Sequence, residues 1–532
     1  MMERSTTVRF CRWLFSWRGL RCLLILLAWL VTLIALFHGE ETWRGRRAWR
    51  QYRRELEAQG EQLDFAALAP KPVPDEQNFA ATPVMKSWFE KTFPKDPAQQ
   101  WDDSYARVAE QVRFPPRAKD AKYERRFNDL VAWETAFAGL RSGELTPRQQ
   151  FYSAKLEAAA RAKAAPGVLE GLKTNEALLA ELRLASQRPD SRYPVNYDVE
   201  MPYAILVPHL GMVKGVCRRL QLKSCAELAS GQSDRALEDL KLMFRVMDSV
   251  KAEPFLISHL VRFSCAQIAT QPIWEGLAEH RWSEAQLQEL ETRLEQYNFI
   301  ADMKAPLAAE RAAGIALVEL VRKKGPWYLN FVGSAEETPE PAGAKLADRI
   351  WFILVPQGWY DLEELNYCRG FQIQLAGALD TTKKRVSPTK VKVDAQALEQ
   401  MMYAPGFAGT GLGAILRHRL TARQLLPAFG KAVMKSAAAQ TAFDQAAIAC
   451  ALERYRLANG HFPETLDALA PRFISPLPND VLTGEPYKYR LTDDGRFVLY
   501  SVGWDEKDDG GVPGKTLFDD KQGDWVWEYP TK

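Results

Sequence analysis

The chain has 532 residues, enough for about three domains of ordinary size, and its 47% hydrophobic and 26% charged residues are typical of a folded protein. Its net charge of +3 is unevenly distributed: eleven Arg and five Glu in the first 60 residues give +6, which leaves −3 for the remainder. The positive charge therefore flanks an apolar segment. This excludes a basic nucleic-acid-binding domain, and no nucleic-acid partner is expected.

An apolar segment near the N-terminus predicts a membrane anchor. Cys22 to Phe37 is a run of sixteen residues without a charge, which spans about 24 Å as a helix and is slightly shorter than the bilayer norm. Flanking Arg and Trp side chains can make up the difference. We predict a basic cytoplasmic head at 1–21 and a transmembrane signal anchor at 22–38 that contacts the lipid bilayer. A cleaved signal peptide is the alternative, although residues 36–38 lack the small side chains of a cleavage site.

Residues 39–120 are predicted to connect this anchor to the rest of the chain. The segment 48–60 is polar and rich in Arg and Glu, which predicts a helical stalk. Residues 68–83 contain four prolines, and such a composition is typical of an extended linker that lies along a surface.

Residues 121–433 have a helical pattern and predict a large α-helical body. Thr146–Gln149 and Ser283–Gln286 are capping boxes, at which we expect helices to begin. The stretch Ala226–Gly231, followed by Ala236–Leu240, resembles the turn between the two helices of a tetratricopeptide repeat. One such unit occurs without a recurrence, so an ordinary helical hairpin is the alternative.

The seven cysteines form no Cys-x-x-Cys pair, and those at 217, 225, 265 and 450 lie in apolar helical surroundings. Buried free thiols are therefore the expected state. A disulfide between Cys217 and Cys225, or between another pair, stays open because spacing alone does not decide it.

The C-terminal part combines a helix with a short hairpin. Residues 446–458 are helical in pattern, and Asn459-Gly460 supply a left-handed stop. Strand-like runs at 487–491 and 496–502 flank Asp493-Asp494-Gly495, which is a hairpin signal. A stretch rich in Gly and Asp follows the second run.

This order of elements resembles the C-terminal half of the major pseudopilin (G-type) of type II secretion systems. In that family a helix ending in Tyr, Asn-Gly and Tyr/Phe-Pro leads to a small sheet and a calcium loop. The resemblance implies a pseudopilin-like α+β module at 434–532 and a link to a secretion or pilus-type assembly. The expected fold is therefore mainly α, with an N-terminal transmembrane helix, a large α-helical body and a small C-terminal α+β module.

The resemblance also implies a location. The arginines on the two sides of the anchor are nearly balanced, so charge alone does not set its orientation. Because the C-terminal part is similar to an extracytoplasmic module, we expect a single-pass protein of the inner (cytoplasmic) membrane with the bulk of the chain outside the cytoplasm.

The acidic loop that follows the hairpin is the predicted metal site. The resemblance places five acids in the calcium loop of the family: Asp505, Asp508, Asp509, Asp519 and Asp520. Calcium takes about six to eight oxygen ligands at roughly 2.3–2.6 Å, which clustered carboxylates and backbone carbonyls supply. Such an ion would be structural. A solvated acidic loop without an ion is the alternative.

The functional prediction is non-catalytic. The chain contains no His-Glu-x-x-His and no Gly-x-Ser-x-Gly, and its six His are dispersed. We expect a membrane-anchored envelope protein with an interaction or scaffold role and a protein partner. The alternative is an extracytoplasmic, hydrolase-like enzyme with its site in the helical body. A deep pocket lined by carboxylates or His within 195–320 would favour the enzyme, and exposed Trp351, Phe352 and Trp359 would favour binding.

Overall fold

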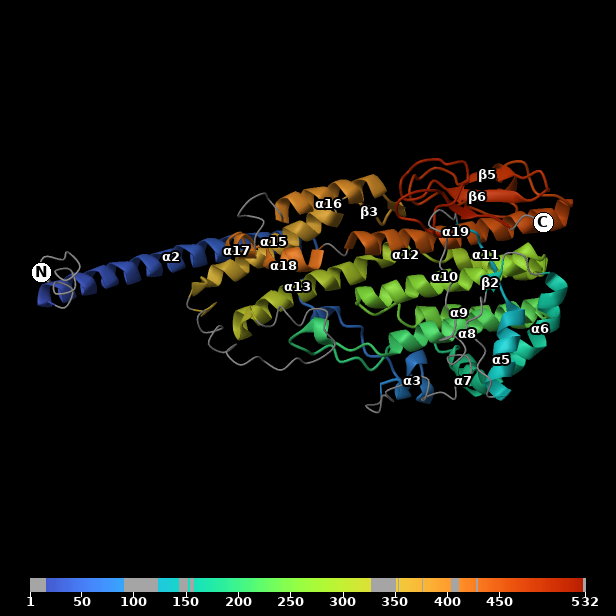
Figure 1. Ribbon diagram of the computed structural model, residues 1–532, viewed down its shortest axis with the longest axis horizontal. Coiled ribbons are helices and arrows are strands. Elements are labelled where there is room, and N and C mark those ends of the chain that lie inside the picture. The colour runs from blue at the N-terminus through green and yellow to red at the C-terminus, as the bar shows by residue number, and fades with distance from the viewer. Residues whose placement is uncertain are drawn as a thin grey trace, which may run out of the picture.

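The computed structural model describes residues 16–89, 123–142, 152–153, 157–326, 351–352, 354–375, 377–402, 411–426 and 429–529. This part of the protein is mainly helical, and a single helix protrudes from one end of an elongated body (Figure 1). The prediction of a mainly α fold with one long apolar N-terminal helix is confirmed. The helix start predicted at Thr146 lies outside the described residues.

The protruding helix is α2 (Trp17–Ala58), which has 42 residues and is therefore about 63 Å long. The large apolar side chains in its N-terminal half are exposed, as at Leu26 and Leu36. By length and composition α2 can cross a membrane. A signal sequence meets the same criteria, so both predicted alternatives for this segment stand.

The C-terminal half of α2 does not stand apart from the body as a stalk. Its side chains Trp49 and Leu56 are buried, and the helix packs along α15 (Gln357–Leu375). A Cβ atom on Gly45 would lie 2.1 Å from the carbonyl oxygen of Gly358, so the two backbones approach to a distance that only glycine allows. The stalk prediction is corrected here: the segment is helical, but its buried face makes it part of the body.

The proline-rich segment after α2 lies along the body as predicted, and it is fixed there by buried side chains. It contains short turns of helix, including α3 (Pro83–Ser87). Phe79 and Trp88 are buried. The backbone N–H of Phe79 donates to the carbonyl oxygen of Asp190 at 2.8 Å. The linker is therefore a packed strap, not a free spacer.

The helices of the body follow in chain order: α5 (Leu130–Ser142), α6 (Ala158–Gly171), α7 (Glu176–Ala185), α8 (His209–Ala229), α9 (Ser233–Asp248), α10 (Leu256–Ala278), α11 (Glu284–Glu295), α12 (Phe299–Asp302), α13 (Lys304–Lys324), α15, α16 (Pro388–Met402), α17 (Gly411–Leu416), α18 (Leu420–Leu425) and α19 (Phe429–Asn459). Two short antiparallel ladders accompany them: β1 (Phe127–Asn128) with β2 (Tyr152–Ser153), and β3 (Leu379–Asp380) with β4 (Arg385–Val386). The capping box predicted at Ser283 is present, since Ser283 Oγ accepts from the N–H of Gln286 and the Gln286 side chain accepts from the N–H of Ser283.

Helices α8 and α9 form the hairpin that resembles a tetratricopeptide unit. Gly231 has a φ of +74° in the turn, a conformation that favours glycine. Ala226 and Ala236 are both fully buried. Helix α10 packs against both α8 and α9. The hairpin is confirmed, while its kinship with the repeat family stays a prediction.

Helix α19 is the central element of the core. Nearly all its side chains from Phe429 to Arg454 are buried, and many of them are alanines. A helix that is buried on all sides must be apolar or small around its whole circumference. It packs against α10, α11 and α12 and also contacts the C-terminal sheet. The boundary predicted at 433/434 falls inside α19, which therefore belongs to body and sheet alike.

The C-terminal sheet has three antiparallel strands in the order β5 (Lys488–Leu491), β6 (Phe497–Ser501) and β7 (Trp525–Trp527). Gly495 has a φ of +75° in the β5–β6 turn. The first two strands lie within the predicted runs. The side-chain amide of Gln445 in α19 donates to the carbonyl oxygen of Trp525 at 2.7 Å and so ties the sheet to the central helix.

The six cysteines that the structure describes are free thiols, and five of them are buried. The prediction of buried free thiols at Cys217, Cys225, Cys265 and Cys450 is confirmed, and the alternative disulfide between Cys217 and Cys225 is not formed.

Candidate functional site

The acidic loop between β6 and β7 holds the five predicted metal ligands, and its carboxylates mainly accept hydrogen bonds from nearby groups. Asp519 accepts from three backbone N–H groups, those of Lys515, Lys521 and Gln522, at 2.9–3.2 Å. Asp508 accepts from the hydroxyl of Tyr500 at 3.1 Å. These bonds are local and give the loop its shape.

The other three predicted ligands are half-buried or exposed. Asp505 is half-buried and accepts from the N–H of Lys507 at 3.3 Å. Asp509 and Asp520 are exposed. Within the described ranges, no group of three or more His, Cys, Asp or Glu side chains gathers in the way that could hold a metal ion. Calcium binding by this loop stays a prediction.

Asp524 is a residue of this loop that the predicted ligand set does not include. Its side chain is fully buried and accepts from the N–H of Gly511 at 2.6 Å and from that of Asp509 at 3.3 Å. The carboxylate thereby joins the start of the loop to β7. The only sequence signal for this residue is weak, because it is simply an acid that directly precedes a Trp at the start of a strand.

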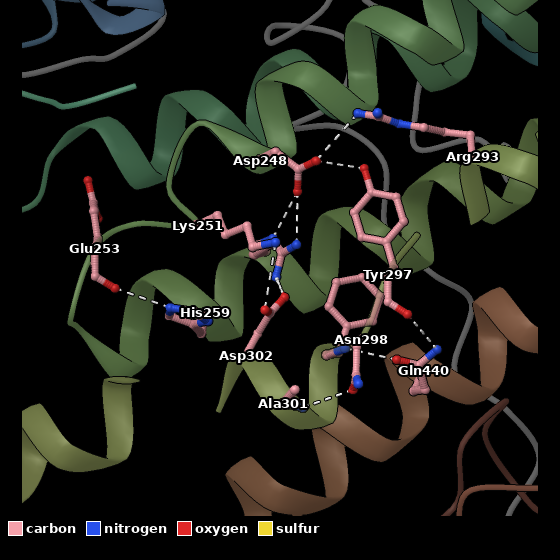
Figure 2. A network of polar contacts seen from close by, with 12 residues as sticks. Asp248, Lys251, Glu253, His259, Arg293, Tyr297, Asn298, Ala301, Asp302 and Gln440 are labelled. Carbon is pink, nitrogen blue, oxygen red and sulfur yellow. Dashed lines mark hydrogen bonds and ion pairs between the residues drawn. The ribbon is translucent and has the colours of Figure 1, made fainter. Parts of the chain in front are cut away.

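A polar cluster around Arg262 brings several charges together inside the body. The guanidinium of Arg262 is fully buried, and it donates to Asp248 at 2.9 and 3.0 Å and to Asp302 at 2.6 Å. The hydroxyl of Tyr297 donates to Asp248 at 2.7 Å. In Figure 2 Asp248, at the end of α9, and Asp302, at the end of α12, converge with Tyr297 from the α11–α12 connection.

The Arg262 cluster extends to the central helix. The backbone N–H of Phe299 donates to the side-chain oxygen of Gln440 in α19 at 2.8 Å, and the Gln440 amide donates to the carbonyl oxygen of Tyr297 at 3.3 Å (Figure 2). Four helical segments are therefore held in register by one buried cation and one amide. Such an arrangement serves structure, because breaking one partner of a buried ion pair is costly.

Two histidines of the body, His209 and His259, belong to a second buried group around Glu253. His209 Nε2 lies 2.7 Å from Glu253 Oε1, and its ring stacks on Tyr193 with centroids 4.1 Å apart. The hydroxyl of Ser258 donates to the other oxygen of Glu253. Burial, with the nearby Arg262 charge, lowers the pKa of His259 to about 4. His209, Glu253 and His259 thus lie close together, and all three side chains are buried between helices.

A groove of about 910 Å³ lies between α7, α9 and α11. Its charged lining residues are Arg183, Glu238, Lys241, Arg245, Glu289 and Arg293. Four cations and two carboxylates give the lining an excess of two positive charges. Figure 1 places these helices in the half of the body opposite to the protruding part of α2.

Ion pairs fix the walls of this groove. Lys241 Nζ lies 2.9 Å from Glu238 and 2.5 Å from Glu289, so it bridges α9 and α11. The hydrogen bond that Lys241 donates to Glu289 raises the pKa of the amine, which keeps it charged at neutral pH. Arg293 lies 3.6 Å from Asp248 and connects the groove to the Arg262 cluster. No single residue pattern in the sequence indicates the groove, because its three walls come from separate helices.

The three aromatic residues whose exposure would favour a binding role are only partly accessible. Trp351, Phe352 and Trp359 are half-buried. The indole N–H of Trp351 donates to the hydroxyl of Tyr360 at 2.8 Å, and that of Trp359 donates to Glu41 at 3.0 Å. These contacts place the aromatic residues at the junction of α2 and α15.

Comparison with known proteins gives no family assignment: no family model, no curated protein and no solved structure matches the chain.

Proposed function

We propose that this chain is a membrane-anchored scaffold of the cell envelope with a non-catalytic interaction role. The groove between α7, α9 and α11 is the observation that carries the proposal. It combines a volume of about 910 Å³ with charges of both signs that are fixed by ion pairs. A lining that is rigid and partly charged suits a segment of a partner protein, and its positive excess favours an acidic segment.

The anchor complements this role. In the proposal α2 crosses the inner membrane once, with the bulk of the chain outside the cytoplasm. Because the second half of α2 is packed into the body, the anchor continues directly into the folded unit that carries the groove. The groove then lies in the half of the body that is farther from the bilayer. A link to a secretion or pilus-type assembly rests on the pseudopilin resemblance of the C-terminal part.

Site-specific cross-linking tests the groove. A photoreactive amino acid at Gln288, which lines the groove, is expected to capture a discrete protein in cells that carry the full chain. The double variant Lys241→Glu with Arg293→Glu should reduce that capture about tenfold. The same probe at exposed Leu491 on the sheet is the control. Equal capture at Gln288 and Leu491, or capture unaffected by the charge reversal, would contradict the groove as the binding site.

Topology is tested separately. The full chain should stay with membranes in alkaline carbonate, and a cysteine at exposed Leu184 should react with a membrane-impermeant maleimide in intact spheroplasts. Reaction of Leu184→Cys only after lysis would place the body in the cytoplasm.

A further inference from the structure

The end of the body nearest the anchor can be located from contacts between α2 and α15. The ring of Phe37, the last residue of the apolar run, lies against Trp359 with centroids 6.4 Å apart. Further along both helices, the guanidinium of Arg369 lies 5.6 Å from the ring of Tyr52. Residue numbers increase together, so α2 and α15 run in parallel. The residues just before α15 therefore point back toward the apolar half of α2.

Exposed apolar residues gather at this end. Leu354, three residues before α15, is 66% exposed, and Leu416 at the end of α17 is 47% exposed. Helix α17 is held beside α15, because the side-chain amide of Asn366 donates to the carbonyl oxygens of Arg417 and His418 at 3.2 and 2.8 Å. The ring of His418 lies 4.9 Å from Trp359. Leu354, Trp359, Leu416 and Arg417 together form what we call the base surface.

The composition of the base surface matches a membrane interface. Transfer of exposed leucine side chains from water to hydrocarbon lowers their free energy. Tryptophan, which has an apolar body and a polar N–H, is enriched at the level of the headgroups. Arg417 and Lys323, at the end of neighbouring α13, are exposed, and cations at this level attract anionic headgroups. A small apolar hollow lined by Val318 of α13 as well as Trp359 shows that α13 ends beside this surface.

We infer that the base surface inserts into the interfacial layer of the same bilayer that α2 crosses, with Leu354 and Leu416 in contact with acyl chains and Arg417 with anionic phospholipid headgroups. The inference rests on the proposed membrane anchoring of α2 and deepens it. A chain held by one helix alone can swivel about that helix. A second contact removes this freedom and directs the groove between α7, α9 and α11 away from the membrane.

Depth-dependent fluorescence tests this inference on the full chain in liposomes of phosphatidylethanolamine and phosphatidylglycerol. Cys11 and Cys22 are replaced by Ser, and a polarity-sensitive dye is attached to Leu354→Cys or, in a second variant, to Leu416→Cys. Both dyes should emit at shorter wavelength than in water and be quenched at least twofold by lipids that carry a spin label near the headgroup. Liposomes without phosphatidylglycerol should weaken the quenching.

Two further positions make the outcomes distinguishable. A dye on Leu184→Cys, at a site that is 81% exposed on α7, should emit at the same wavelength as in water and should not be quenched by the spin-labelled lipids. Leu27→Cys, within the apolar run, should be quenched by spin labels deep in the acyl chains. Quenching at Leu27→Cys, with water-like emission at both Leu354→Cys and Leu416→Cys, would overturn the base contact and leave the anchor intact. Water-like emission at Leu27→Cys as well would overturn the anchor and, with it, this inference.

Discussion

The acidic loop of the C-terminal sheet and the Arg262 cluster are both built on aspartates, but the aspartates do different work. In the loop, Asp519 accepts hydrogen bonds from backbone N–H groups no more than four residues away. In the cluster, Asp248 and Asp302 reach Arg262 across 14 and 40 positions of the chain. The loop carboxylates fold a short segment, whereas the cluster carboxylates fix helices against one another.

This difference has an energetic consequence. Asp508, Asp509 and Asp520 are exposed, so water compensates when a contact is lost. Arg262 is fully buried, so a lost partner leaves a charge without compensation. A charged residue in the cluster should therefore contribute much more to the free energy of unfolding than a charged residue at the rim of the loop.

The largest effect is expected from Arg262→Met. This change leaves Asp248 and Asp302 without their buried counter-charge and should lower the free energy of unfolding by about 3–5 kcal/mol. Denaturant unfolding of the full chain in detergent measures it. The control is Arg53→Met, which breaks an exposed ion pair with Glu57 and should cost at most about 1 kcal/mol. A similar loss for the two variants would contradict the structural role of the cluster.

A smaller effect is expected from Asp524→Ala, in calcium-free buffer so that ion binding does not contribute. The buried N–H of Gly511 and the partly buried N–H of Asp509 lose their acceptor, which should cost about 1–3 kcal/mol. The matched change Asp509→Ala removes an exposed carboxylate from the same loop and should cost less than about 0.5 kcal/mol. Thermal unfolding of both variants decides whether burial, not acidity, makes Asp524 important.

The same contrast explains which features the sequence could predict. The strands β5 and β6 match the predicted runs because the strand-like runs and the Asp-Asp-Gly turn between them are local signals. The Arg262 cluster was not predictable, because Asp248, Tyr297 and Asp302 meet only after several helices have packed. The groove was missed for the same reason. The stalk prediction was wrong because nothing in the pattern of α2 alone indicates the partner that buries Trp49.

A third prediction concerns Glu364, a buried carboxyl whose nearest cation, Arg322, lies 3.8 Å away. Burial raises the pKa of Glu364 from 4.5 to about 9, and the positive charge of Arg322 only partly offsets this rise. The folded chain thus holds a proton that the unfolded chain releases near pH 4.5. The resulting stability is complete below pH 4.5 and is lost as the pH rises toward 9.

Glu364→Gln removes this titration. The parent chain should lose about 1–2 kcal/mol of stability between pH 5 and pH 8 that the variant keeps, since one pKa unit corresponds to about 1.4 kcal/mol and relaxation reduces the full value. Unfolding curves at the two pH values measure the difference. The control is Glu57→Gln on the exposed face of α2, and an identical pH profile for parent and Glu364→Gln would show that Glu364 is ionised in the folded protein.

The smallest effect bears on the acidic loop itself. If the loop binds calcium as proposed, a tenfold excess of the ion over its dissociation constant should stabilise the full chain by about 1.4 kcal/mol, and equal magnesium should not. Asp508→Asn with Asp520→Asn should abolish the shift. Asp519→Asn is unsuitable for this purpose, because its carboxylate also shapes the loop through backbone hydrogen bonds. Melting curves in calcium and in chelator that coincide for the parent would identify the loop as solvated. A calcium-dependent rise in melting temperature that is lost in the double variant would show that a cation holds the carboxylates of this loop together, as Arg262 holds those of the cluster.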